Sequence, residues 1–251
     1  MRFFFISLLC SLQVVAAPDP SALLRETLLA GKRNTARAVN WLSREDIRRY
    51  NSRKLLQWET YEASMVEGSN YYRLAARNGK PLKKQEREEE REKLEREAMR
   101  RRLSPGKTRS VGERYSMSIQ ALLDHHEIKY SGEDVTPDGR KYWIIDTRLH
   151  DFAPLPAGPA DMALSGDATL WIDQETNLLL RQELRVTRVW RAWLPGSLVF
   201  YEMLWNGEVM LVKRISLTLA GQIRRETDQV YSNYRKFASS SDIKFEPSEI
   251  P

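Results

Sequence analysis

Acidic side chains gather in one short stretch, Gly166 to Leu184, which reads GDATLWIDQETNLLLRQEL. Two carboxylates that converge on one cleft can share the acid, base or nucleophile roles of glycoside hydrolysis. Asp173 and Glu175, however, stand with Asn177 between two runs of strand-forming residues, where short polar side chains bind their own backbone. We therefore interpret the stretch as a hairpin whose carboxylates belong to its turn and outer face, with no catalytic role.

The histidines offer no metal site in this reading. His125 and His126 are neighbours, and neighbours on a helix point about 100° apart, while His150 stands alone. A Gly-x-Ser-x-Gly elbow and a glycine-rich phosphate loop are both absent from the sequence. No catalytic residue, metal or cofactor is predicted. The enzyme class that stays open is a hydrolase whose site does not follow a motif.

The first residues, MRFFFISLLCSLQVVAAP, combine one basic residue with an apolar run from Phe3 to Val15 and small residues at Ala16 and Ala17. This order is typical of a secretory signal peptide, and a membrane-spanning helix would need about 20 apolar residues. We expect cleavage after Ala16, a periplasmic location and no transmembrane segment in the mature chain. The only cysteine, Cys10, would be removed, which excludes disulfides and thiol chemistry.

The formal net charge of +6 would suit a nucleic acid. Export argues against that partner. A basic surface outside the cytoplasm is expected to meet anionic lipid headgroups, an acidic partner or no partner. Nucleic acid is therefore left out of the predicted partners.

After the signal peptide the chain is predicted to begin with two helices. Ser21 suits the N-cap of the first, whose leucines recur at helical spacing. The second is predicted to begin at Ser43, because Ser43 and Asp46 have the spacing of a capping box. From Leu55 onward, strand-forming residues predict a β hairpin with turns at 67–70 and 78–79.

Residues 83–102, KKQEREEEREKLEREAMRRR, are almost entirely charged and contain neither Gly nor Pro. Acidic residues stand four positions before basic ones, which favours a helix. Only Leu94, Ala98 and Met99 are apolar, so the helix can bury no more than a narrow seam. We predict a solvated helical arm, which serves either as an exposed spacer or as a docking surface for a partner or membrane.

The rest of the chain, from about 115 to 237, has strand patterns after one short helix in YSMSIQALLDHH and around a loop, HDFAPLPAGPADMALSG. Two segments, Leu178–Trp190 and Glu208–Leu219, alternate apolar and polar residues at a period of two. This pattern predicts that the apolar face of each segment packs against a core. In the second, Val209, Leu211, Ile215 and Leu217 share the apolar face. Strands are predicted at Lys141–Leu149, Ala168–Asp173, Leu178–Trp190, Ser197–Trp205, Glu208–Leu219 and Arg225–Tyr234, with turns at Asp138–Gly139 and Asn206–Gly207.

Three stretches resemble a known family. GDATLWIDQETNLLLRQELRV is similar to the Trp-Ile-Asp hairpin of the LolA/LolB/RseB superfamily, the periplasmic lipoprotein-carrier fold. YYRLAARNGKPL and the closing VYSNYRKF resemble bacterial outer-membrane lipoprotein-sorting-like proteins, and the likeness covers about residues 71–100 and 120–237. The resemblance implies an α+β fold: a half-open, strongly curved antiparallel β-barrel wrapped around helices, with an apolar cavity for acyl chains. The charged helix at 83–102 is absent from the carrier proteins proper and is interpreted as an insertion into this fold.

On this basis residues 17–237 are expected to form a single LolA-like domain, followed by a disordered tail at 238–251. The expected function is a non-catalytic periplasmic binding protein that holds a lipid, acyl chain or lipidated partner in lipid or lipoprotein trafficking to the outer membrane. The alternative is an RseB-like envelope interaction or regulatory protein, with the charged helix as its partner-binding arm. The hydrophobic residues predicted to line the cavity are Trp58, Trp143, Ile145, Leu170, Ile172, Leu180, Leu184, Phe200, Leu211 and Ile215.

Overall fold

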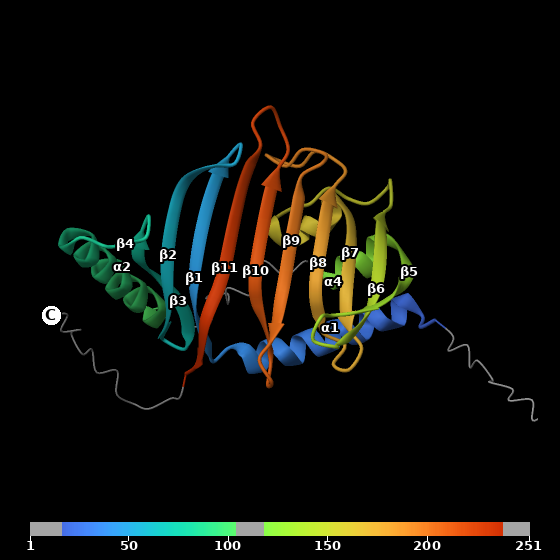
Figure 1. The fold of residues 1–251 in the computed structure, drawn as a ribbon, viewed down its shortest axis with the longest axis horizontal. Coiled ribbons are helices and arrows are strands. Elements are labelled where there is room, and N and C mark those ends of the chain that lie inside the picture. Colours follow the sequence, from blue (N-terminus) through green and yellow to red (C-terminus); the bar gives the residue numbers. More distant parts are fainter. Residues whose placement is uncertain (1–16, 104–117, 238–251) are drawn as a thin grey trace, which may run out of the picture.

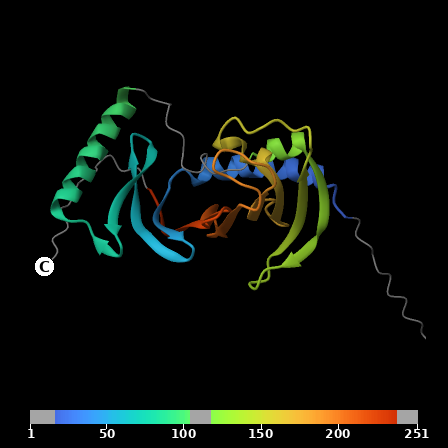
Figure 2. The same cartoon turned by 90° about the horizontal axis from the view of Figure 1, so that it is seen from above.

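The computed structural model describes residues 17–103 and 118–237 (Figure 1). Within them, eleven strands form one antiparallel sheet in the order β4-β3-β2-β1-β11-β10-β9-β8-β7-β6-β5. The sheet is open, because β4 and β5 at its two edges do not pair with each other, and it is curved (Figure 2). The predicted fold class is confirmed. The predicted signal peptide and C-terminal tail lie outside the described residues.

In the described ranges, the eleven strands and four helices have the following bounds. The strands are β1 (Trp41–Asn51), β2 (Lys54–Val66), β3 (Ser69–Arg77), β4 (Lys80–Pro81), β5 (His126–Val135), β6 (Lys141–Leu149), β7 (Gly166–Asp173), β8 (Leu179–Val186), β9 (Leu198–Trp205), β10 (Met210–Leu219) and β11 (Arg225–Lys236). The helices are α1 (Pro20–Ala38), α2 (Lys84–Leu103), α4 (Ile119–His125) and the 3₁₀ helix η1 (Pro159–Ser165).

Most of the predicted strands are confirmed. β6 has the predicted bounds, and β7, β9, β10 and β11 differ from the prediction by no more than two residues at either end. The turns at 138–139 and 206–207 are also confirmed. Gly139 and Gly207 have φ angles of 88° and 94°, a left-handed conformation that glycine adopts without a steric penalty.

β1 shows that the helix predicted from Ser43 is wrong. Ser43, Glu45 and Ile47 are buried and the residues between them less so, which is the two-residue period of a strand. β1 pairs with β2 on one side and with β11 on the other. These two ladders bury one face of the segment. The strand is therefore stabilised by more than the capping pattern would stabilise a helix.

The ends of two other elements differ from the prediction. β8 ends at Val186 instead of Trp190, because Arg188 leaves the sheet and donates to the carbonyls of Leu164 and Ala153, each at 2.8 Å. The short helix α4 ends at His125, where the chain turns directly into β5. β5 was not predicted as a strand, and part of the predicted loop before β7 forms η1.

The helices α1 and α4 pack on one face of the sheet, the inner face, over its β5 to β10 half (Figures 1 and 2). α1 begins after Asp19, whose side chain accepts the N–H of Ser21 at 3.0 Å. Asp19 and not Ser21 is therefore its N-cap. No helix of the described residues is long and apolar enough to cross a membrane.

The charged helix α2 confirms the helix predicted at 83–102, but it is docked and does not project freely. Its buried side chains are charged: Glu90 accepts the backbone N–H of Leu74 at 3.2 Å. Arg101 donates to the carbonyls of Val66 and Ser69 at 2.9 and 2.7 Å. These backbone groups belong to β3 and to the last residue of β2, so α2 covers the sheet edge that β4 leaves largely unpaired.

Candidate ligand-binding site

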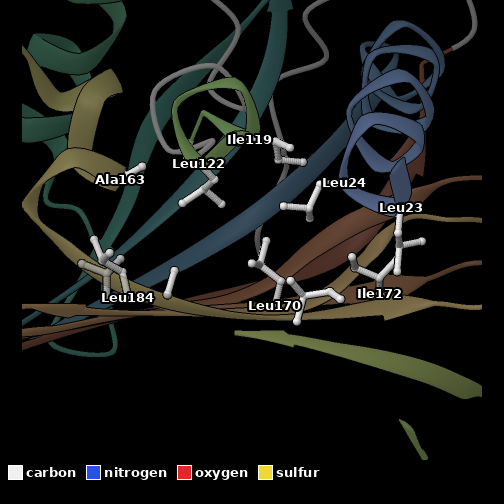
Figure 3. Close-up of a cluster of buried hydrophobic side chains, with 11 residues drawn as sticks. Leu23, Leu24, Ile119, Leu122, Ala163, Leu170, Ile172 and Leu184 are labelled. Carbon is white, nitrogen blue, oxygen red and sulfur yellow. The ribbon is translucent and has the colours of Figure 1, made fainter. Parts of the chain in front are cut away.

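The main apolar cluster lies between the inner face of the sheet and the helices (Figure 3). Leu23 and Leu24 of α1 and Leu122 of α4 point toward Leu170 and Ile172 of β7. All five side chains are buried. Because side chains from both layers fill the space between them, this cluster forms the hydrophobic core.

Part of the predicted cavity lining lies on the inner face, and five of these residues belong to the main apolar cluster or pack against it. Residues opposite each other on antiparallel strands share a face, and the pairing places six of the ten predicted residues on the inner face. Five of the six are fully buried and Trp143 is half-buried. The six are Trp143, Ile145, Leu170, Ile172, Leu184 and Ile215. In this state they contact protein side chains, which take the place expected for a ligand.

Trp58 and Phe200, predicted to line the cavity, lie on the outer face. Trp58 stands opposite Arg48, which contacts its ring at 4.8 Å, and its indole N–H donates to Asp46 at 3.2 Å. Phe200 contacts the guanidinium of Arg181 at 4.7 Å. Both aromatic rings therefore pack against charged groups on the surface away from the helices.

Leu211 is also on the outer face, although its spacing from Ile215 predicted the same face for both. The pairing of β10 with β9 shifts between Val212 and Arg214, so one extra residue interrupts the alternation. Leu211 lies opposite Leu204, while Ile215 faces the core. A bulge depends on the partner strand, which the alternation within one segment does not reveal.

A second, smaller apolar cluster lies under the C-terminal half of α1. It joins Ala30 of α1 to Met210 at the start of β10 and includes the predicted residue Leu180. A pocket of about 130 Å³ opens beside it. The pocket is lined by Ala30, Arg33, Asn34, Arg37, Thr176, Leu178 and Trp205. Ala30, Leu178 and Trp205 of this cluster therefore border a pocket that opens to solvent.

Two arginines give this pocket a positive opening. Arg33 and Arg37 lie one helical turn apart, are exposed and form no ion pair within residues 17–103 and 118–237. A third cation nearby is already neutralised: Arg140 contacts the Trp205 ring at 5.5 Å and pairs with Asp173 at 2.5 Å. The opening can therefore receive an acidic group at Arg33 and Arg37.

The acidic stretch that might have been catalytic is structural. Asp173 is 1% exposed and accepts the backbone N–H groups of Glu175 at 3.0 Å and Thr176 at 2.8 Å. Its other oxygen binds Arg140. Glu175 is exposed in the same turn. The turn interpretation of these carboxylates is confirmed.

The inner face becomes polar on β1, β2 and β11. Glu45, Glu59, Gln229 and Tyr231 are buried there. The Tyr231 hydroxyl donates to Glu45 at 2.9 Å, and Arg49 donates to Glu59 at 3.0 Å. The sequence did not predict this network, because the capping pattern at Ser43 placed Glu45 and Arg49 on a helix. The two-residue spacing of these side chains, if assigned to a strand, would have put them on one face.

Proton affinities in this network follow burial and pairing. Burial raises the pKa of the Glu45 carboxyl above its usual value, against the opposing effects of Tyr231 and Arg49. Burial acts to raise the pKa of Glu59 as well, but the hydrogen bonds with Arg49 and Tyr61 have a larger, opposite effect. The net pKa of Glu59 therefore lies below its usual value. Burial and the bond to Glu59 raise the pKa of Tyr61 to about 12. The folded protein is therefore less stable when the Glu45 carboxyl is charged.

The histidines take structural positions. His126 is buried, its Nε2 lies 3.0 Å from the carbonyl of Ala163, and burial lowers its pKa to about 4. His150 stacks on Phe152 with ring centroids 5.0 Å apart. Within the part of the chain that the structure describes, no group of three or more His, Cys, Asp or Glu residues is arranged to hold a metal ion.

A larger depression of about 460 Å³ lies over the outer face of β5 to β8. Charged side chains of both signs line it, among them Glu127, Lys129, Arg148 and Glu183. Such a lining does not suit an acyl chain. The smaller pocket beside α1 is the better candidate for an apolar ligand, because it adjoins buried apolar side chains.

No family model and no curated protein matches the chain. Among solved structures it is similar to a LolA superfamily protein from Nitrosomonas europaea, with 10% sequence identity and a TM-score of 0.40 over 93% of this chain and 100% of that one. A DUF1329 family protein from Desulfovibrio piger gives 13% identity and a TM-score of 0.43 over 91% and 98%. A domain named as an outer-membrane lipoprotein-sorting protein, from Vibrio parahaemolyticus, gives 10% and 0.39 over 85% and 93%. At these values the similarities carry no information on ligand or partner.

Proposed function

We propose that this chain is a non-catalytic binding protein of the periplasm that takes up the hydrophobic chain of a lipid or lipidated partner between α1 and the sheet. One observation carries the proposal: the second apolar cluster reaches solvent through a pocket flanked by Arg33 and Arg37, two exposed arginines. An apolar interior behind a positive opening suits an amphiphile with an acidic headgroup.

The size of the pocket says how uptake would occur. A volume of about 130 Å³ is the share of roughly four water molecules, at about 30 Å³ each. An acyl chain therefore needs the C-terminal half of α1 to move away from β8, β9 and β10. Burying about a dozen methylenes would gain roughly 10 kcal/mol. Micromolar affinity corresponds to a binding free energy of about 8 kcal/mol, so only a small part of this gain remains to offset the free energy of moving the helix.

Identification of lipids extracted from the protein, purified from its native envelope, tests the proposal directly. Titration with a fluorescent fatty acid then tests the site. Ala30→Trp fills the pocket and should weaken binding at least about tenfold. Arg33→Glu with Arg37→Glu should weaken binding of the acidic probe but spare an uncharged analogue. Lys32→Glu, on the same helix but outside the pocket, is the control and should bind as the unchanged protein does.

The proposal is wrong if no lipid is extracted and the filled pocket binds the probe as well as the open one. Thermal melts of each variant separate loss of the site from loss of the fold. Equal weakening by Lys32→Glu would show a general charge effect, and would remove Arg33 and Arg37 from the site.

A second candidate function, partner binding through α2, is favoured by one observation. Met99 and Leu103 lie one turn apart on α2 and are 64% and 75% exposed, although most of the helix is charged. An envelope protein with an acidic surface and an apolar groove would fit this end of the helix. Met99→Ser with Leu103→Ser should abolish such binding and leave fatty-acid binding unchanged. Cross-linking in the native envelope, followed by identification of the captured protein, would show whether Met99 and Leu103 contribute to partner binding.

A further inference from the structure

Four of the connections between strands at one end of the sheet lie next to one another. The antiparallel order brings together the β1–β2 turn, the β6–β7 loop, the β8–β9 loop and the β10–β11 loop at the end drawn uppermost in Figure 1. These segments, residues 51–56, 150–165, 187–197 and 220–225, are called the loop rim. They are far apart in the sequence and adjacent only because the strands pair.

Hydrogen bonds tie the loop rim into one surface. The N–H of Ser52 donates to the carbonyl of Arg224 at 2.9 Å, which joins the β1–β2 turn to the β10–β11 loop. The N–H of Ala220 donates to the Ser197 hydroxyl at 3.0 Å, which joins that loop to the β8–β9 loop. The indole of Trp190 donates to the carbonyl of Pro156 at 2.9 Å and adds the β6–β7 loop. The rim is therefore a continuous surface of four linked loops.

The loop rim presents large apolar side chains to solvent. Seven of the thirteen large hydrophobic side chains that are exposed in the described residues belong to it. Phe152 and Leu155 are the most exposed of them, at 82% and 66%. The others are Leu55, Leu56, Val189, Leu194 and Ile223. Exposed apolar residues that gather at one place mark an interaction surface, whereas single scattered ones need no explanation.

Basic residues accompany these apolar side chains. The four segments hold six basic residues, Arg53, Lys54, Arg188, Arg191, Arg224 and Arg225, against two acidic ones, Asp151 and Asp161. Arg188 is engaged with loop carbonyls, and Arg224 pairs with Glu226 at 2.5 Å. The other four basic residues form no ion pair within the described part of the chain. The surface is thus apolar and cationic.

Two of these arginines have an energetically unfavourable backbone conformation. Arg53 and Arg191 have φ angles of 72° and 52°, in the left-handed region that side chains with a Cβ rarely adopt. Asn or Gly would adopt this region with less strain. Strained residues that carry exposed cations are consistent with a functional demand on this surface.

We propose that the loop rim docks the protein on an anionic lipid bilayer. Apolar side chains on projecting loops can enter the headgroup region by about 5–10 Å, while arginines beside them meet lipid phosphates. The excess of unpaired cations favours a bilayer with anionic lipids over an uncharged one. This inference concerns the end of the sheet remote from the β9–β10 turn and does not depend on the ligand pocket under α1.

Vesicle co-sedimentation tests the proposal, with full-length mature protein and vesicles of phosphatidylcholine alone or with phosphatidylglycerol. We expect binding to the anionic vesicles that falls at least about tenfold in 0.5 M salt, since salt screens charge–headgroup attraction. Phe152→Ser with Leu155→Ser should remove the apolar contribution, and Arg53→Glu with Arg191→Glu the cationic one. Each pair should lower binding by about tenfold or more.

Matched controls lie away from the loop rim. Val135→Ser with Leu204→Ser removes exposed apolar side chains elsewhere, and Lys32→Glu with Lys141→Glu reverses exposed charges elsewhere. Both control pairs should bind anionic vesicles as the unchanged protein does. Absence of vesicle binding by the unchanged protein, or equal losses in rim and control variants, overturns the proposal. Circular dichroism and melting confirm that each variant is folded before it is scored.

Discussion

The side-chain amide of Asn34 forms two hydrogen bonds with the backbone of Met210. Its Nδ2 donates to the Met210 carbonyl at 2.8 Å, and its Oδ1 accepts the Met210 N–H at 2.7 Å. Met210 is the first residue of β10, and Asn34 lies in the last turns of α1. The amide fixes the helix to the sheet beside the pocket, and holds α1 closed over the second apolar cluster.

Asn34→Ala should destabilise the protein by about 1–3 kcal/mol, because two backbone groups lose their partner. It should also speed fatty-acid uptake, since the C-terminal half of α1 would separate from β10 more easily. Urea unfolding and stopped-flow fluorescence measure the two effects. Thr35→Ala, at the next and exposed position, is the control for both. Slower uptake in Asn34→Ala would contradict a role for α1 in opening the site.

Arg101→Met should cost about 3 kcal/mol or more, because it leaves carbonyls of Val66 and Ser69 without their donor in a buried place. The matched variant Arg96→Met, on the exposed face of α2, should cost no more than about 0.5 kcal/mol. Chemical denaturation measures both. If the two variants are equally stable, α2 is the free arm that its composition predicted.

Glu45→Gln should change how stability depends on pH. Burial raises the folded-state pKa of Glu45 above the ordinary value of 4.5. The stability linked to its protonated form is therefore complete below about pH 4.5 and is lost as the pH rises through the folded-state pKa. Glu45→Gln removes this loss, so the variant should gain stability relative to the unchanged protein as the pH rises toward neutrality. Urea melts across pH 4 to 8 would show a widening difference, and a constant difference would contradict the assignment.

His126 should impose the opposite dependence. Burial lowers its pKa from 6.5 to about 4, so the unfolded chain binds a proton at a higher pH than the folded one. Stability is therefore complete above about pH 6.5 and falls as the pH drops through 4, by about 3 kcal/mol in total. His126→Gln should flatten this acid-dependent loss, while His125→Gln should keep it. Thermal melts from pH 7 to 4 compare the slopes.

Local chemistry predicted those elements whose signals lie within a few residues. The turns at Gly139 and Gly207 follow from residues that accept positive φ, and β6 has its predicted bounds because its apolar face repeats at a period of two. The helix at 83–102 follows from paired charges and good helix formers. These signals do not depend on distant neighbours.

The candidate site was less predictable. Leu170, Ile172 and Leu184 were correctly placed on the core face, but whether helix side chains or a ligand fills the space opposite depends on α1 and α4. Leu211 changed face because of a bulge against β9. Arg33 and Arg37 gave no signal as pocket residues, since exposed arginines on a helix are ordinary. Their proximity to Trp205 is visible only in the folded chain.

From its sequence, the described chain could be known as an antiparallel sheet with one apolar face, a charged helix and no cysteine with which to cross-link them. These properties rest on residue types and short spacings. Folding adds contacts such as the bond between Tyr231 and Glu45, 186 positions apart. It makes β1 a strand between two partners, buries Glu90 and Arg101 along an edge that needs donors and acceptors, and gathers four loops into one rim. Those outcomes depend on which backbone groups and apolar faces remain unsatisfied when the strands pair, and short sequence windows hold no record of that.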